Sequence, residues 1–299
     1  MNAVVTASKP ASWTDNFVWL IKRELWEHKA LYIAPLIVAA LVIAGTLLSL
    51  NTVSETLATL DTLTDKQRLG IRMAGYFVTS TLFMLVMSVV TANYALDALY
   101  AERRDRSMLF WKSLTISDIE TVVSKLAVAA VLAPLIAIVM SLLTQLVMFT
   151  LLGFASLYAG HGFSLPWQGI AVGDVMGLLL FGALVQTLWY LPLWAYCLLA
   201  SAWAQRAPFL WAVLPPVVLS LVESVVFGTH YVRTVCIQRL NAIFPLSINS
   251  NQIGPESPRL DEMLNPGALL ASPAMWIGLV IAGALIAATV WVRRYREVA

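Results

Sequence analysis

The sequence predicts an all-α membrane protein in which six transmembrane helices follow an amphipathic interfacial helix. Of its 299 residues, 60% are hydrophobic and only 12% are charged, a composition outside the range of soluble domains. The apolar runs are continuous rather than alternating, and about 20 apolar residues cross a hydrocarbon core roughly 30 Å thick as a helix. In lipid, backbone N–H and C=O groups must form their hydrogen bonds within the protein, so such runs favour helices. The expected spans are 31–50, 74–96, 122–152, 175–203, 209–227 and 275–292.

The third expected span is longer than a bilayer requires. At about 1.5 Å per residue, residues 122–152 overshoot the hydrocarbon core. We therefore expect this helix either to project into water or to bend at Pro134, where the helix loses a backbone donor.

The distribution of basic residues predicts the orientation. Most of the 19 Lys and Arg residues fall within the N-terminal residues 1–29, in the loop at about 97–118, and after the last span. By the positive-inside rule, both termini and this loop are cytoplasmic, and the segment at about 228–272 is external. The first ten residues lack an apolar core, so we expect no cleavable signal peptide. The transmembrane domain is then 30–299.

Residues 12–29 have apolar side chains at helical spacing and charged side chains between them. This pattern is typical of a helix that lies along a membrane surface. Two interpretations remain open, an anchor for the first span and a contact for a partner protein. The residues singled out for such a contact are Phe17, Ile21, Lys22, Arg23 and Glu24.

The loop at about 97–118 concentrates charge in a chain that has little of it. Ser117 and Glu120 have the spacing of a capping box, which gives the third helix a defined start. Aromatic residues lie beside basic ones, a combination that interfaces favour. The loop is either a solvated turn that enforces topology or a docking tip. The candidate docking residues are Glu102, Arg103, Arg104, Arg106, Phe110, Trp111, Ser113, Leu114 and Ser117.

The order Glu102-Arg103-Arg104, Ser113-Leu114, Ser117 and Lys125 resembles the cytoplasmic loop of ABC-2-type transporter permeases, the membrane subunits of type V ABC exporters. Thr115 stands where that family commonly has proline. The likeness extends more loosely to the layout of the whole chain.

The resemblance implies that the loop is the coupling helix and that residues 12–29 form the connecting helix. It implies a multi-pass protein of the bacterial inner membrane, paired with a second copy or a homologous permease. Spans one, two and five are then expected to line the substrate pathway. The partner is a separate ABC ATP-binding subunit, which binds ATP and Mg, and this chain itself holds no cofactor.

Motifs that the chain lacks narrow the function classes. It has no Gly-x-x-x-x-Gly-Lys-[Ser/Thr] sequence, and its three histidines are scattered, so neither an ATPase nor a common hydrolase is expected in this chain. Its two cysteines give no metal or disulfide framework. A net charge of +2 does not indicate a nucleic-acid partner.

Two other function classes remain open, a secondary transporter and a non-transporting membrane scaffold or immunity-type protein. Glu223 is the acid expected to be embedded in a span, and it is a candidate for the pathway or its outer gate because intramembrane acids are rare. The transported substrate is not specified by these residues.

Overall fold

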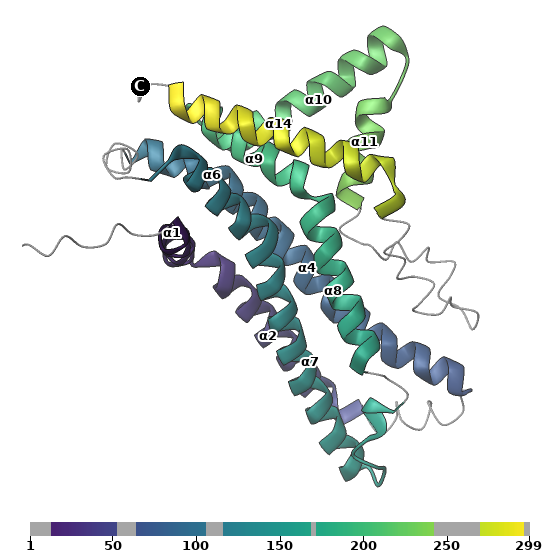
Figure 1. The fold of residues 1–299 in the computed structure, drawn as a ribbon. Helices are drawn as coiled ribbons and strands as arrows, with labels where there is room; N and C mark the ends of the chain where they lie inside the picture. Colours follow the sequence, from purple (N-terminus) through teal and green to yellow (C-terminus); the bar gives the residue numbers. More distant parts are fainter. Residues whose placement is uncertain (1–12, 53–63, 106–115, 169–171, 242–269, 296–299) are drawn as a thin grey trace, which may run out of the picture.

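The computed structural model describes residues 13–52, 64–105, 116–168, 172–241 and 270–295. The helices among these residues are α1 (Trp13–Glu27), α2 (Ala30–Ser49), η1 (Leu50–Thr52), α4 (Asp65–Arg104), α6 (Asp118–Ala127), η2 (Val128–Leu132), α7 (Ala133–Tyr158), η3 (Leu165–Trp167), α8 (Val172–Trp189), α9 (Leu191–Trp203), α10 (Pro208–Phe227), α11 (Tyr231–Asn241) and α14 (Pro273–Tyr295). No strand occurs among the described residues, in agreement with the all-α expectation. In Figure 1, α2, α4 and α7 pack alongside one another, and α14 packs along α9.

Five stretches of helix are long and apolar enough to cross a membrane, as expected for a multi-pass membrane protein. They overlap the first, second, third, fifth and sixth expected spans. The fourth, 175–203, is not one straight helix: Leu179–Trp189 and Leu191–Trp203 meet at an angle of 46°. Pro192 at the start of α9 accounts for the break, because proline cannot donate to the preceding turn. Counted as one span, the bent pair brings the number to six.

The third span is a helix of 41 residues, Asp118–Tyr158, which at about 1.5 Å per residue is about twice as long as the hydrocarbon core is thick. It is interrupted by η2, a π-helical turn that ends just before Pro134. Because Pro134 has no backbone N–H, the carbonyl of Ala130 has no donor four residues later. The hydroxyl of Thr187 in α8 donates to that carbonyl oxygen at 2.7 Å. The irregularity expected at Pro134 is therefore this turn, and α8 holds it.

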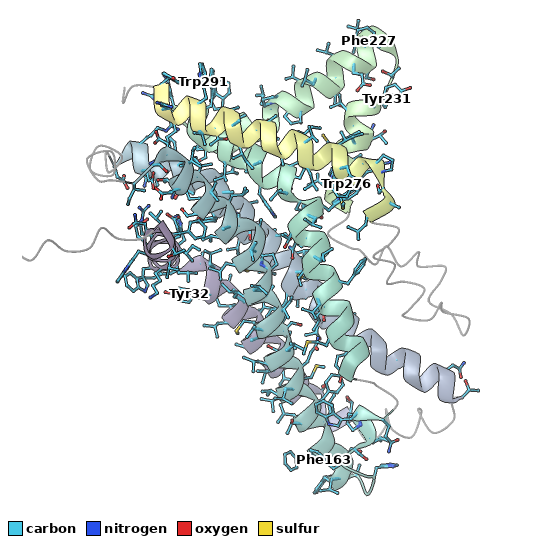
Figure 2. All side chains as sticks on the ribbon, viewed as in Figure 1. Tyr32, Phe163, Phe227, Tyr231, Trp276 and Trp291 are labelled. Atoms are coloured by element: carbon cyan, nitrogen blue, oxygen red, sulfur yellow. The ribbon has the colours of Figure 1, made fainter. Side chains whose placement is uncertain are left out.

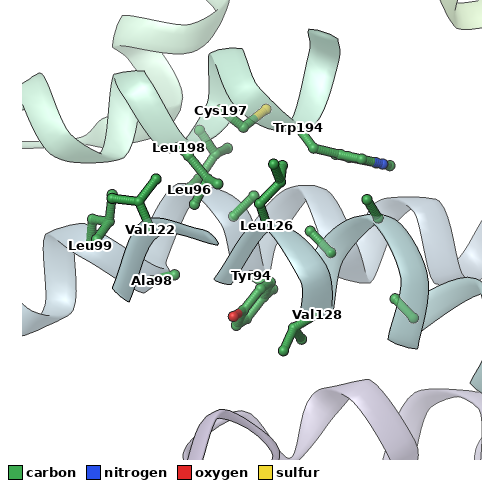
Figure 3. Close-up of a cluster of buried hydrophobic side chains, with 14 of the residues drawn as sticks. Tyr94, Leu96, Ala98, Leu99, Val122, Leu126, Val128, Trp194, Cys197 and Leu198 are labelled. Atoms are coloured by element: carbon green, nitrogen blue, oxygen red, sulfur yellow. The ribbon is translucent and has the colours of Figure 1, made fainter. Parts of the chain in front are cut away.

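The largest group of buried apolar side chains lies where α4, α6 and α9 meet (Figure 3). Leu99 of α4, Val122 of α6, and Trp194 and Leu198 of α9 are almost fully buried. Between helices in lipid, close packing rather than the hydrophobic effect supplies the attraction. This packing sets the position of the ends of α4 and α6, which carry the charged groups described below.

Aromatic side chains mark both ends of the last span. Figure 2 shows Trp276 near the start of α14 and Trp291 near its end, and both side chains are exposed. Tryptophan favours the two membrane–water interfaces, where its ring is partly apolar and its N–H reaches water. The positions agree with α14 as a transmembrane helix.

Candidate functional site: a buried ion cluster

α1, the end of α4, the start of α6 and the end of α14 converge at one end of the molecule (Figure 1). Six charged side chains from these four helices meet there. Each of them forms an ion pair with at least one other. We call this group the ion cluster. Its members are Arg23 and Glu24 of α1, Glu102 of α4, Asp118 and Lys125 of α6, and Arg293 of α14.

The centre of the ion cluster is a ring of alternating charges. Lys125 Nζ lies 2.7 Å from Glu24 Oε1 and 3.1 Å from Glu102 Oε1. Arg23 Nη2 bridges the same two oxygen atoms, at 3.0 Å from Glu24 and 2.6 Å from Glu102. Two cations and two carboxylates thus join α1, α4 and α6 at one point.

Arg293 extends the ring to the last helix. Its Nη1 donates to the second carboxylate oxygen of Glu102 at 2.6 Å, and its Nε donates to Asp118 Oδ1 at 2.9 Å. Both oxygens of Glu102 are therefore engaged. Glu102 contacts cations from three other helices, which makes it the central residue of the ion cluster.

Local helix chemistry positions these groups. Ser117 Oγ accepts from the backbone N–H of Glu120, and the Glu120 carboxylate accepts from the backbone N–H of Ser117. This capping box, which the sequence predicts, fixes Asp118 as the first residue of α6. Arg293 lies in the last turn of α14, where the helix dipole favours a cation. Glu102 lies in the last turn of α4, where the dipole disfavours an acid, so its surrounding cations are needed.

Tyr94 and His28 complete the surroundings of Glu24. The Tyr94 hydroxyl donates to Glu24 Oε2 at 2.9 Å, and the His28 ring packs edge-on against the Tyr94 ring. His28 Nε2 lies 3.8 Å from the same carboxylate. Burial lowers the pKa of His28 despite the nearby Glu24 charge, so the imidazole is neutral at neutral pH.

The formal charges of the ion cluster cancel, because it holds three cations and three carboxylates. Glu24 and Lys125 are each 1% exposed, and Glu102 is 5% exposed. Burying an ion pair costs desolvation energy that the attraction only roughly repays, whereas removing one partner costs about 3–5 kcal/mol. The cluster therefore contributes little net stability as a whole, but the loss of any one partner leaves a buried charge uncompensated.

A second polar contact ties α4 to α9. Arg103 Nη2 donates to the backbone carbonyls of Ser201 and Ala204, at 2.5 and 2.7 Å, where α9 ends. The Ser201 hydroxyl oxygen accepts from the backbone N–H groups of Leu99 and Tyr100. Arg103 satisfies carbonyls that a helix end leaves without partners, so the end of α9 is tied to the end of α4.

The structure divides the candidate docking residues into three groups. Glu102 and Arg103 point into the protein, in contrast to the exposed positions that a docking surface needs. Arg104 is exposed and paired with Asp105, and Ser117 is the cap of α6. The remaining candidates lie outside the described residues: Arg106, Phe110, Trp111, Ser113 and Leu114.

The residues singled out on the interfacial helix fall into two sets, one inside the ion cluster and one outside it. Arg23 and Glu24 belong to the ion cluster. Phe17 and Ile21 are half-buried, and Lys22 is exposed with its ammonium over the Trp19 ring. The helix predicted over 12–29 is thus present as α1, with one face held by charges rather than only by apolar contacts.

Glu223, the candidate for a pathway or an outer gate, is near the end of α10. Its carboxylate accepts from the hydroxyl of Thr229 and from the backbone N–H groups of Tyr231 and Val232. It therefore satisfies the first N–H groups of α11. Of the expected external segment, residues 242–269 lie outside the described stretches of the chain.

Sequence reasoning did not single out the pairing of Lys125 and Arg293 with Glu102, or of Arg293 with Asp118. One signal was present, because Lys125 is a charged residue inside the expected third span, and charged residues in spans are usually paired. The partners are far apart in the chain, 101 residues for Lys125 and Glu24 and 191 for Arg293 and Glu102, and no local pattern reveals such pairs.

Among the described residues, no group of three or more His, Cys, Asp or Glu side chains is arranged to hold a metal ion. No family model, no curated protein and no solved structure matches this chain.

Proposed function

We propose that this chain is the membrane-embedded permease subunit of an ATP-driven exporter of the ABC-2 type. In this proposal it acts in a bacterial inner membrane as a dimer, with a second copy or a homologous permease. A separate ABC ATP-binding subunit binds ATP and Mg and contacts the cytoplasmic side. This chain lacks a phosphate-binding loop motif, so the energy comes from that partner.

The observation that carries the proposal is that one buried ion cluster joins the two segments assigned to partner contact. Glu102 and Asp118 both lie within the predicted coupling loop, about 97–118, while Arg23 and Glu24 lie on α1. A displacement of either the loop or α1 is therefore transmitted to the ends of α4, α6 and α14 together. A coupling element needs such a shared rigid point.

The long third helix supplies a site where that displacement can be absorbed. α6 carries Asp118 and Lys125 of the ion cluster, and the π-helical turn η2 separates it from α7. Hinges and kinks are typical of such turns and of proline. We infer that α6 tilts with the ion cluster and that η2 lets α7 follow in a different direction.

The alternative classes differ in their source of energy. A secondary transporter moves solute with the purified chain and an ion gradient alone. A scaffold or immunity-type protein binds a partner without stimulating ATP turnover. Neither has a specific observation in its favour among the described residues.

Affinity isolation of the chain from native membranes in a mild detergent tests the proposed partner. We expect the wild-type chain to retain an ATP-binding subunit and Arg104→Glu to lose it, because Arg104 is exposed beside the loop. Arg294→Glu is the matched control, since it reverses another exposed charge at the end of α14. Equal recovery of the ATP-binding subunit by both variants contradicts docking at this loop.

A further inference from the structure

One carboxylate near the end of α4 lies outside the ion cluster. Asp97 is half-buried, and its carboxylate has neither a hydrogen bond nor an ion pair with any described residue. Of the basic residues that follow on α4, Arg103 binds the end of α9, and Arg104 pairs with Asp105 and acts on Asp97 only as a nearby charge without contact. A half-buried carboxylate without a contacting cation can pair with a cationic group of a bound ligand.

Asp97 lines an open cavity of about 550 Å³ between the start of α2, the last four turns of α4 and the start of α10. This volume is within the usual range for small-molecule sites. Most of the wall is apolar, with Leu31, Val90, Leu96 and Phe209 among its residues. The cavity can therefore surround a hydrocarbon chain beside one carboxylate.

The polar side of the cavity is one stripe of α4. Asn93, Asp97 and Tyr100 follow one another at spacings of four and three residues, which places them on one face of the helix. The Asn93 amide donates to the Val89 carbonyl, which leaves its own carbonyl oxygen as an acceptor. Together with the Asp97 carboxylate and the Tyr100 phenol, the stripe offers acceptors at three positions. A group that only donates hydrogen bonds, such as an ammonium, matches these acceptors.

The opposite wall does not neutralise Asp97. His28 lines the cavity, and burial lowers its pKa, so it carries no charge at neutral pH. Tyr94 also lines the cavity, but its hydroxyl donates to Glu24. The cations behind this wall, Arg23 and Lys125, are matched by the carboxylates of the ion cluster.

We propose that this cavity binds the ammonium group of an amphipathic cation. The head group pairs with Asp97 and contacts Asn93 and Tyr100, and the hydrocarbon tail lies against Leu31, Leu96 and Phe209. A free alkylamine and the ammonium of a phospholipid head group present the same chemistry. The site does not depend on the proposed permease function, because binding needs neither ATP nor a partner subunit.

Photolabelling of the purified full chain in phosphatidylglycerol nanodiscs tests the site. The probe is dodecylammonium with a diazirine at the end of its tail, and labelled peptides are identified by mass spectrometry. We expect saturable labelling of the cavity wall, and Asp97→Asn should weaken it at least about tenfold, the effect of losing a charged hydrogen bond. Asp97→Glu should retain binding. Asp105→Asn, which removes an exposed carboxylate from the end of the same helix, should bind as the wild type does.

The lipid composition of the nanodiscs distinguishes the two sources of ammonium. If added phosphatidylethanolamine competes with the probe in the wild type, the lipid head group is an occupant of the site. If it does not compete, the site selects a free alkylamine. Equal labelling of the wild type and Asp97→Asn overturns the proposal, and so does equal labelling by a dodecyl sulfate analogue of the probe.

Discussion

Replacement of Lys125 by methionine tests the ion cluster directly. The Lys125 side chain is 1% exposed, and its Nζ lies 2.7 and 3.1 Å from two carboxylates. At an effective dielectric constant of about 20, each contact corresponds to roughly 5–6 kcal/mol of attraction. Desolvation of the ammonium and repulsion from Arg23 offset much of this attraction. The net cost of truncating one partner of a buried pair is about 3–5 kcal/mol.

We therefore expect Lys125→Met to lower the free energy of unfolding by about 3–5 kcal/mol. The measurement is reversible unfolding in mixed micelles, followed by circular dichroism. The matched control is Lys22→Met, which removes an exposed lysine of α1 outside the ion cluster and should change stability by less than about 0.5 kcal/mol.

The double variant Glu24→Gln/Lys125→Met separates charge imbalance from lost packing. It removes one cation and one carboxylate, so the remaining formal charges of the ion cluster cancel again. We expect the double variant to be more stable than the sum of the single effects predicts, by about 1–3 kcal/mol. Additive effects, or a cost for Lys125→Met below about 1 kcal/mol, refute the reasoning about a coupled buried cluster.

Three further predictions concern single contacts. Thr187→Val leaves the Ala130 carbonyl without its hydroxyl donor and should cost about 1–3 kcal/mol in unfolding free energy, whereas Thr187→Ser should retain most of the stability. Gly153→Ala places a Cβ 2.8 Å from the Phe163 ring and 3.0 Å from its backbone oxygen, so overpacking should cost about 1–3 kcal/mol. The pKa of His28 in an NMR titration should lie below 6.5. Because the folded protein binds this proton less readily than the unfolded chain does, the free energy of unfolding should fall as the pH decreases through and below 6.5. A folded-state pKa above 6.5 contradicts the burial argument.

The sequence was sufficient to predict the elements that depend on local pattern. Continuous apolar runs gave the approximate positions of the spans, because the thickness of lipid sets their length. The capping box at Ser117 and Glu120 is confirmed as the start of α6, since capping depends on residues three apart. The break before α9 was not predicted, although Pro192 is the residue that causes it.

The ion cluster was not predictable from the same pattern, because it depends on helix packing. The charge-rich loop pattern predicted Glu102 as a docking residue, yet it is 5% exposed and is contacted by three cations. Arg293 appeared to mark only orientation near the end of the chain. Which helices adjoin one another determines which charges pair, and a single sequence contains no direct record of that arrangement.

ATP turnover by the complex isolated from native membranes is the most direct test of the proposed function. We expect the wild-type chain to copurify with a subunit that hydrolyses ATP. Lys125→Met should retain that subunit but alter its turnover, since the ion cluster lies between the contact segments and the spans. A folded wild-type chain that copurifies with no ATP-hydrolysing subunit contradicts the account.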